Sequence, residues 1–286
     1  SAEVRFNPTG QVSVFTGSHG HGQGHDTTFA QIAADQLGVS IENVDVVHGD
    51  TDKGPFGMGT YGSRSLTNGG TAIIKACEKI IKKGKRVAAK MLEAKEEDIN
   101  FKDGEFIVAN SNKKKTIGEI AFACYLPGQY GEVKSPLPAG VEPGLKETSF
   151  YDPINFSFPA GTHICEVEVD PDTGETKVVS YTAVDDFGTV INPMIVDGQV
   201  VGGTAHGIGN SLFEWMGYDE NAQPITTNLA EYLLVNSTEM PQVELGQMVS
   251  PTPLNPLGVK GVGECGVVSA PAAIICLLYT SDAADE

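Results

Sequence analysis

The feature that most constrains the fold of this chain is a local order that occurs twice. Two strands joined by a tight turn lead into a glycine-rich loop and then into a helix, clearly in residues 3–37 and more loosely in residues 163–214. In the first copy, EVRFNPTGQVSVFTG predicts a hairpin that turns at Pro-Thr-Gly. Strict alternation of parallel strands and helices is absent, which disfavours a Rossmann sheet. We therefore expect an α+β protein made of two similar hairpin–loop–helix lobes.

The chain divides into two lobes and a connection. We expect a first lobe in residues 1–125, a connecting segment in residues 126–158 and a second lobe in residues 159–275. The middle segment is rich in Pro and Gly and has no period, as in a linker or a functional crossing segment. A strand pattern begins almost at once, so an N-terminal portion is expected to be missing. Residues 276–286 resemble the translation of a sequencing adapter, an artefact that we exclude from fold reasoning.

Composition narrows the class of protein. The formal charge of −18 repels nucleic-acid phosphates and anionic lipids, so neither is expected as a partner. No run of about 18 apolar residues occurs and no signal-peptide pattern is present, so we expect a cytoplasmic protein without an integral membrane segment. The five cysteines are never arranged as CxxC. This spacing favours a reducing compartment and argues against a structural zinc site.

The first glycine loop, HGHGQGH in residues 19–25, allows two interpretations. Its three histidines could converge on a metal ion, but no acidic or cysteine partner stands at a recognisable spacing. Alternatively, successive backbone N–H groups just before a helix would form a cradle for an anion. The sequence favours the cradle. The helix that follows is expected to be capped by Asp26 or Thr27 and to end at Gly38.

The second glycine loop, GTYGSRS, carries a compact set of polar groups. Ser63, Arg64 and Ser65 supply two hydroxyls and a planar guanidinium, which suit a phosphate or a polyoxygenated ligand. Taken alone, the pattern is weak evidence for a site. An ordinary turn whose arginine pairs with a surface carboxylate is the default interpretation.

The third glycine loop, KGVGECG in residues 260–266, matches the spacing of a dinucleotide-binding loop but not its context. Three prolines precede it, and no acidic residue follows at the required distance. Glu264 stands between glycines and apolar residues, where a carboxylate can be desolvated and can act as a general base. An ordinary exposed loop glutamate is an equally good interpretation.

Four segments together resemble a known family. GHGQGHDTTFAQIAADQLG, GDTDKGPFGMGTYGSRS, DDFGTVINPMIVDGQVVGG and KGVGECGVV, in this order, resemble the molybdenum-binding subunit of the xanthine dehydrogenase and aldehyde oxidase family. Within it, the likeness is greatest to the aerobic carbon monoxide dehydrogenase branch. The resemblance covers nearly all of residues 1–275 and corresponds to the C-terminal part of that subunit.

The resemblance implies a molybdopterin-binding domain whose loops converge on a molybdenum cofactor, in its cytosine dinucleotide form. The cofactor would be lined by Gln23, Gly24, His25, Asp26 and Thr27. Its pyranopterin or diphosphate region would be held by Ser63, Arg64 and Ser65. The clamp would be completed by Gln199, Lys260, Gly261, Val262 and Gly263. Glu264 matches the family's active-site glutamate. No side chain of this chain would ligate the metal, which the cofactor's sulfurs hold.

The resemblance also implies an oxidoreductase working in a complex. Its partners would be an iron–sulfur small subunit and an FAD-binding medium subunit, in a dimer of heterotrimers located in the cytoplasm or at the inner membrane face. Carbon monoxide oxidation would add a copper ion bridged to molybdenum, on a loop outside this chain. Hydroxylation of purines, aldehydes or N-heterocycles is the alternative within the family, and a cofactor-free structural fragment is the alternative outside it. Two residues depart from the family pattern: His21 replaces a frequent Gln, and Phe187 a frequent Cys.

Overall fold

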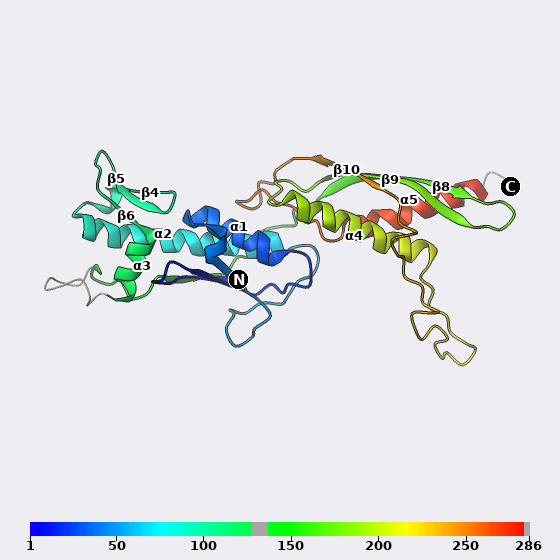
Figure 1. Cartoon of the computed structure of the whole chain (residues 1–286), viewed down its shortest axis with the longest axis horizontal. Helices are drawn as coiled ribbons and strands as arrows, with labels where there is room; N and C mark the ends of the chain where they lie inside the picture. Colours follow the sequence, from blue (N-terminus) through cyan, green and yellow to red (C-terminus); the bar gives the residue numbers. More distant parts are fainter. Residues whose placement is uncertain (127–136, 283–286) are drawn as a thin grey trace. The chain divides into compact units, whose positions relative to one another are not determined.

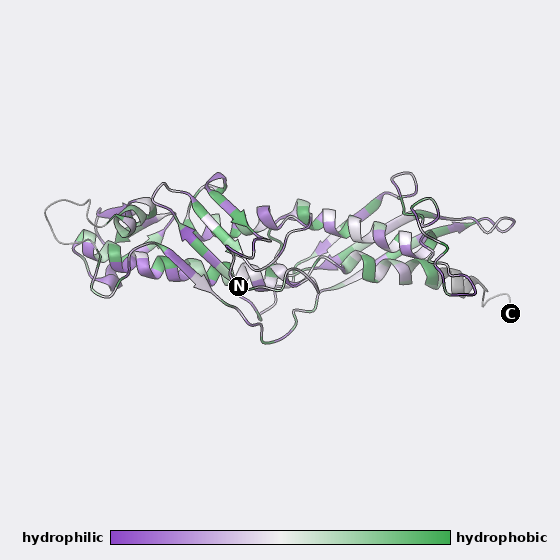
Figure 2. Ribbon diagram, turned by 90° about the horizontal axis from the view of Figure 1, so that it is seen from below, coloured by the Kyte–Doolittle hydropathy of each residue, from purple (hydrophilic) through white to green (hydrophobic). Residues whose placement is uncertain are grey.

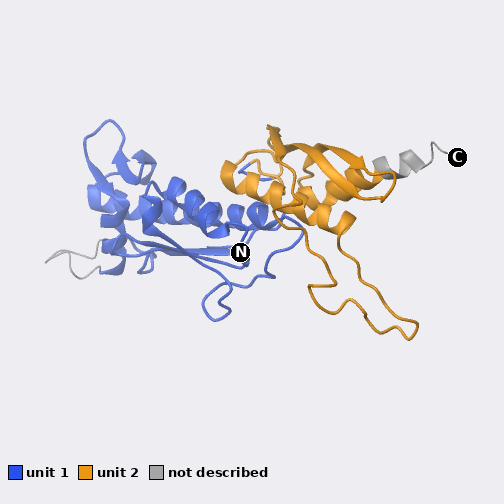
Figure 3. Ribbon diagram, turned by 45° about the vertical axis from the view of Figure 1, so that its right-hand side comes forward, with its two compact units in different colours: residues 1–154, 255–257 blue, residues 155–254, 258–286 orange. Residues whose placement is uncertain are grey.

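The computed structural model describes residues 1–126 and 137–282, with side chains described as far as residue 276. The chain forms two compact units (Figure 3). Unit 1 comprises Ser1–Ile154 and Asn255–Leu257, and unit 2 comprises Asn155–Leu254 and Gly258–Glu286. Both units contain a hairpin followed by helices, so the prediction of an α+β fold is confirmed.

The main sheet of unit 1 has the strand order β3-β2-β1-β7. Its strands are β1 (Ala2–Phe6), β2 (Val12–Thr16), β3 (Val44–Val47) and β7 (Lys146–Ser149). Strand β1 is antiparallel to β2 and β7, whereas β2 and β3 run parallel. The predicted hairpin is therefore present, and its partner β7 comes from the segment expected to connect the lobes. Residues 127–136 of that segment lie outside the described residues.

Two helices cover this sheet: α1 (His25–Leu37) and α2 (Thr71–Leu92). Alternate residues of β1 are buried, and the strands and helices of unit 1 carry both hydrophobic and hydrophilic residues (Figure 2). The core between these elements consists of large apolar side chains, including Val4, Phe6, Phe29, Ile73 and Ile80, all fully buried or nearly so. Because α1 and α2 have apolar stripes at helical spacing, both were predictable from sequence. Helix α1 ends at Gly38 in the left-handed conformation, as predicted.

A second, smaller sheet of unit 1 has the order β4-β5-β6. Strands β4 (Ile99–Lys102) and β5 (Glu105–Val108) form the predicted Asp-Gly hairpin, and β6 (Lys114–Thr116) leads into α3 (Ile117–Tyr125). Gly84, in the middle of α2, packs on this sheet. A Cβ at Gly84 would lie 2.3 Å from the Phe106 ring, so the close approach of helix and ring requires glycine there.

Short helical turns complete unit 1. They are η1 (Ile41–Asn43), η2 (Leu66–Gly70) and η3 (Glu96–Asp98). The apolar pattern in the sequence predicts a helix from Thr71, but the wide turn η2 has the π geometry and runs directly into α2, so the helix begins five residues earlier. The glycines at its end explain the difference, because they gave this stretch the composition of a loop. Gly69 contacts α1 closely: a Cβ there would lie 2.9 Å from the Phe29 ring.

Unit 2 consists of a three-stranded sheet packed on two helices (Figure 1). Strands β8 (Ala160–Val169) and β9 (Thr176–Asp186) form the predicted long hairpin, and β10 (Val243–Met248) adds to β9 in parallel. The helices are α4 (Pro193–Leu212) and α5 (Cys265–Asp282). Helix α4 begins at Pro193, a residue that favours the first helical position, with Asn192 as its cap. The sequence predicts an apolar face of Ile195, Val196, Val200 and Val201, of which Val196 and Val200 are buried, but Val201 is 37% exposed.

Small residues bring α4 and α5 together. A Cβ at Gly266 would lie 2.4 Å from the backbone nitrogen of Thr204, and a Cβ at Gly207 would lie 2.5 Å from Cβ of Ala270. Gly203 and Gly207 of α4 are therefore explained by close packing against α5. The backbone of α5 continues through residues 276–282, the segment set aside on sequence grounds. Within the described residues, no helix is long and apolar enough to cross a membrane.

Candidate functional site: a cofactor cradle

The first glycine loop connects β2 to α1 and is shaped by Gln23. The Gln23 side chain accepts a hydrogen bond from the His21 backbone N–H at 2.6 Å and donates one to the His19 carbonyl at 3.2 Å. Gly22 and Gly24 have φ angles of 103° and 76°, a region that side-chain-bearing residues rarely adopt. The loop is thus folded on itself by one side chain and two glycines.

Gly24 is the residue that caps α1, so the prediction that Asp26 or Thr27 caps this helix was wrong. The Gly24 carbonyl accepts hydrogen bonds from the backbone N–H and the hydroxyl of Thr28. Asp26 and Thr27 lie exposed in the first turn of the helix. The left-handed conformation of Gly24 lets the chain enter the helix without a side-chain cap, which leaves the first backbone N–H groups without a protein acceptor at the cap.

The second glycine loop crosses the first at close range. A Cβ at Gly57 would lie 2.0 Å from the Gly17 carbonyl oxygen, and the backbone N–H of Gly59 donates to that same oxygen at 3.2 Å. The hydroxyl of Thr60 donates to the His19 carbonyl at 2.6 Å and is 2.8 Å from that of Ser65. Unit 1 therefore brings together the two loops that the sequence singled out.

Arg64 is held by neutral groups. Its guanidinium lies 5.0 Å from the centre of the Tyr61 ring. In the amide orientation that satisfies both groups, the side-chain oxygen of Asn68 accepts from Nε and Nη2 of Arg64 at 3.0 and 3.1 Å. The default interpretation of an arginine paired with a surface carboxylate was therefore wrong. Its charge is oriented but is not neutralised by these partners, and is available to an anion.

Two helix N-termini flank these loops. Helix α1 begins at His25, and the continuous helix of η2 and α2 begins beside Ser65, which is buried. The N-terminal end of a helix carries a partial positive charge and points unpaired N–H groups outward. Together with Arg64, the two ends give the crossing loops the electrostatic character of an anion cradle.

His25 is a neutral, partly buried ring at the base of the cradle. The ring stacks on Phe29 with a centre-to-centre distance of 5.1 Å. The pKa of His25 is lowered to about 4, chiefly by burial and also by the nearby His21 and His48, against the opposite influence of Asp26 and the His19 backbone. Within the described part of the chain, its buried Nδ1 has no hydrogen-bond partner. A buried polar atom of this kind is normally satisfied, so Nδ1 fits a ligand group.

His48 is a residue of this region that the sequence analysis missed. It follows β3 directly, its Nδ1 accepts a hydrogen bond from the Gly20 backbone N–H at 3.2 Å, and its Nε2 lies 2.9 Å from Asp26. A Cβ at Gly20 would lie 2.8 Å from the His48 ring. The parallel pairing of β2 and β3 places the ends of both strands at one edge of the sheet. A histidine at the end of a short strand was the signal available in the sequence.

The third glycine loop belongs to unit 2. The backbone N–H of Lys260 donates to the Phe187 carbonyl at 2.8 Å, and its ammonium lies 2.8 Å from Asp186 in a largely buried ion pair. Burial raises the pKa of Asp186, but Lys260 and the backbone N–H groups of Gly188 and Ser250 lower it more, to well below its usual range. Lys260 therefore fixes the start of the loop. The Phe187 side chain fills the core of unit 2 and is 2% exposed.

Glu264 stands at the N-terminus of α5, where its carbonyl accepts a hydrogen bond from the Val268 backbone N–H. Its side chain is exposed within this chain. Gln199 is half-buried on α4, and Gly261 is buried at the start of the loop.

Comparison with known proteins now gives these features a family. A family model described as the molybdopterin cofactor-binding domain matches residues 1–241. The chain belongs to this family. Across residues 1–126 and 137–276, no three His, Cys, Asp or Glu side chains are grouped so that they could hold a metal ion.

Relatives with curated names and a solved structure agree with this assignment. The chain is 42% identical, over 92% of its length, to the carbon monoxide dehydrogenase large chain of Hydrogenophaga pseudoflava. It is 40% identical, over 96% of its length, to the nicotine 6-hydroxylase large subunit of Paenarthrobacter nicotinovorans. It covers 32% and 33% of those proteins. A crystal structure of a Cu,Mo-CO dehydrogenase is similar to this chain, with 38% sequence identity and a TM-score of 0.89. The match covers 98% of this chain and 35% of the chain in the crystal structure. The chain thus spans about a third of the length of these relatives.

The residues of unit 1 fit a molybdopterin cofactor. Its phosphate groups need backbone N–H donors and a cation, which the first turn of α1 and Arg64 offer. Its polar ring atoms need side-chain partners, and His25 Nδ1 is a buried group that still requires one. Glycines at positions 17, 20 and 57 keep the crossing loops free of side chains that would collide with backbone or ring atoms. Shape and donor set therefore agree with the family.

Proposed function

We propose that this chain is the cofactor-cradling part of a molybdenum hydroxylase that oxidises a small substrate with water-derived oxygen. The observation that carries the proposal is the crossing of the first two glycine loops beside two helix N-termini, with Arg64 oriented by neutral partners. Matched to the sequence resemblance, Gln23, Gly24, His25, Asp26 and Thr27 line the cofactor, and Ser63, Arg64 and Ser65 hold its phosphate or pyranopterin region. In unit 2, the same resemblance matches Gln199 and Lys260 to Gly263 to residues that contact the cofactor in the family.

The bound group supplies a molybdenum Lewis acid that activates water-derived oxygen and accepts two electrons. The chain's own contribution is positioning and proton transfer. The Glu264 carboxylate, at the N-terminus of α5, accepts the proton that the water-derived nucleophile gives up. His25 stays neutral near pH 7, so it adds no positive charge beside the cofactor. We propose the cytosine dinucleotide form because the two helix ends and Arg64 suit a diphosphate.

Carbon monoxide is our first candidate substrate, because the relatives at 40 to 42% identity include two carbon monoxide dehydrogenase large chains. In that case copper bridged to molybdenum would be held by a residue outside this chain. Hydroxylation of an N-heterocycle is the second candidate, favoured by the similar 40% identity to nicotine 6-hydroxylase. For either substrate we propose iron–sulfur and FAD-binding partner subunits, to which the electrons pass, in a dimer of heterotrimers located in the cytoplasm or against the inner membrane face.

The proposal is tested by cofactor content. Arg64→Gln keeps a side chain of similar reach but removes the charge and the planar fork. In the purified complex, we expect molybdenum and pterin per chain to fall about tenfold, as for the loss of a strong charge-assisted contact. Lys102→Gln, which also removes one charge but from an exposed strand position, is the matched control and is expected to keep full cofactor content. Normal molybdenum and pterin in the Arg64 variant would contradict the role of Arg64, and their absence from the unaltered complex would support the alternative of a cofactor-free structural chain.

A further inference from the structure

A second concentration of positive charge lies on α2, away from the glycine loops. Residues 75–90 carry seven of the 19 lysines and arginines of a chain whose net charge is −18. Four of them, Lys79, Lys82, Lys83 and Arg86, are spaced by three or four residues and so lie along one side of the helix. At 1.5 Å per residue, Lys83 is about 25 Å along the helix from Ser65. This cluster therefore does not take part in the cofactor cradle.

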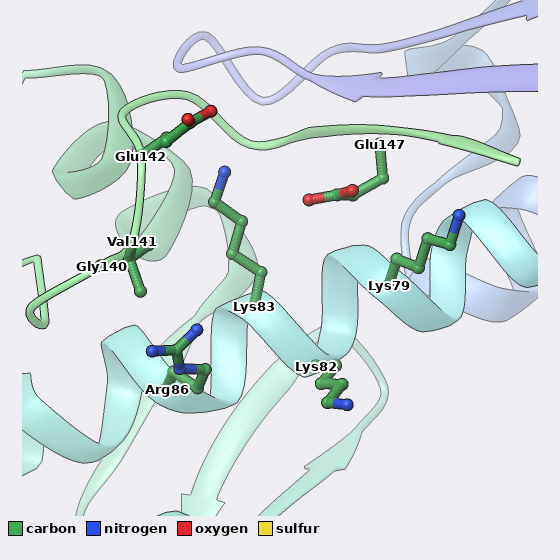
Figure 4. Close-up of a pocket in the computed structure, with 8 residues that line it drawn as sticks. All are labelled: Lys79, Lys82, Lys83, Arg86, Gly140, Val141, Glu142 and Glu147. Carbon is green, nitrogen blue, oxygen red and sulfur yellow. The ribbon is translucent and has the colours of Figure 1, made fainter.

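These four residues line a hollow between α2 and the segment that leads into β7 (Figure 4). The hollow has a volume of about 320 Å³, and Glu142 and Glu147 stand on its opposite wall. Figure 4 shows the Lys83 ammonium pointing up between these two carboxylates. Lys83 and Arg86 are half-buried, so their charges are partly shielded from solvent.

Hydrogen bonds hold the wall at both ends of the hollow. The Lys79 ammonium donates to the Thr148 carbonyl at 2.6 Å, and the Lys90 ammonium donates to the Leu137 carbonyl at 2.6 Å. The fully buried Leu145 anchors the same segment in the core. The hollow is therefore bounded at each end by a hydrogen bond between α2 and the opposite wall.

The charges in the hollow are not balanced by ion pairs. Among the described residues, none of the four cations lies within 4.0 Å of a carboxylate oxygen, although two carboxylates face them. Four positive charges on adjacent turns repel one another, and partial burial strengthens the repulsion. Four cations against two carboxylates leave an excess of two positive charges, which a dianion would neutralise.

We propose that this hollow binds a small phosphate monoester. Lys83 offers a point charge and Arg86 offers a planar fork that matches phosphate oxygens, whereas the Lys82 ammonium points away from the opposite wall (Figure 4). Glu142 and Glu147 can accept hydrogen bonds from the hydroxyl groups of the ester's organic part. The volume is at the lower end of small-molecule sites, which suits a short metabolite.

The experiment titrates the 286-residue chain with glycerol 3-phosphate, inorganic phosphate and glycerol by calorimetry at constant ionic strength. We expect saturable binding of glycerol 3-phosphate, weaker binding of inorganic phosphate and none of glycerol. Lys83→Gln and Arg86→Gln are expected to weaken binding about tenfold each, and Glu142→Gln is expected to strengthen it. Lys85→Gln, which removes a charge from the same helix outside the hollow, is the matched control and is expected to change nothing.

Two results would overturn the proposal. The first is the absence of saturable binding of glycerol 3-phosphate. An equal loss of affinity in the Lys85 variant would count in the same way, because it would mean that the ester is attracted to the basic helix as a whole. The second is binding of an acidic peptide, such as a short polyglutamate, at the same variants without binding of the phosphate ester. That outcome would make the surface a docking site for a protein. Circular dichroism of each variant shows whether the helix has kept its fold.

Discussion

The neutral state of His25 gives a testable dependence of stability on pH. The pKa of this ring is about 4 in the folded chain, against an ordinary value of 6.5. Because the folded-state pKa is the lower one, the unfolded chain takes up the proton first as the pH falls. The free energy of unfolding is therefore unaffected by His25 above pH 6.5 and decreases as the pH falls from about 6.5 to about 4.

The magnitude follows from linkage. For these two pKa values, lowering the pH from 7 to 5 costs roughly 2 kcal/mol. The ring keeps some contact with solvent, so we reduce this figure to about 1 kcal/mol. His25→Gln cannot titrate and removes this component while leaving every other titrating group in place.

The assay is urea unfolding of the 286-residue chain and of the His25→Gln chain at about pH 7 and pH 5. We expect the original chain to lose about 1 kcal/mol more stability between the two conditions than the variant does. Equal losses in the two chains would show that His25 is not held neutral by its surroundings. A smaller loss in the original chain would reverse the sign and refute the argument.

Three further predictions concern packing, the C-terminus and the cofactor. Gly57→Ala places a Cβ 2.0 Å from the Gly17 oxygen and should lower the free energy of unfolding by about 1–3 kcal/mol. Gly202→Ala, at a helix position with open space around it, should raise the free energy of unfolding by about 0.5–1 kcal/mol. Equal shifts in the urea midpoints of the two variants would contradict the crossing of the loops. Deleting residues 276–286 should leave the thermal midpoint unchanged, because Ile274 is buried whereas Ile275 and Cys276 are exposed; a fall of several degrees would mean that the segment is native. The 286-residue chain expressed by itself should contain little molybdenum by elemental analysis, since the relatives are about three times as long; one molybdenum per chain would refute this.

Local features of the fold could be predicted from sequence because their causes are local. The Pro-Thr-Gly and Asp-Gly turns, the apolar stripe of α2 and the proline at the start of α4 each specify one element without reference to the rest. The early start of the helix at η2 could not be predicted in this way. Its glycines are needed for contact with Phe29 on α1, which is a tertiary requirement.

The site was predictable in its location and not in its detail. The glycine loops and Arg64 stood out by composition. The partner of Arg64 is Asn68, one helical turn further along, rather than a surface carboxylate. His48 contacts Gly20 of the first loop, 28 residues earlier in the sequence. The two residues meet because β2 and β3, which precede them, pair in parallel. Glu264 is exposed in this chain, so its ability to act as a base depends on its environment in the complete enzyme.

The most direct test of the central claim is the turnover of Glu264→Gln in the complete enzyme. Glutamine keeps the shape of the side chain but cannot accept a proton. We expect normal molybdenum content and normal assembly, with turnover at saturating substrate lower by a factor on the order of a hundred or more. Glu175→Gln, an exposed position in the β8–β9 turn, is the control and should retain full turnover. Full turnover in the Glu264 variant would contradict the account and leave this carboxylate with a role in seating the cofactor alone.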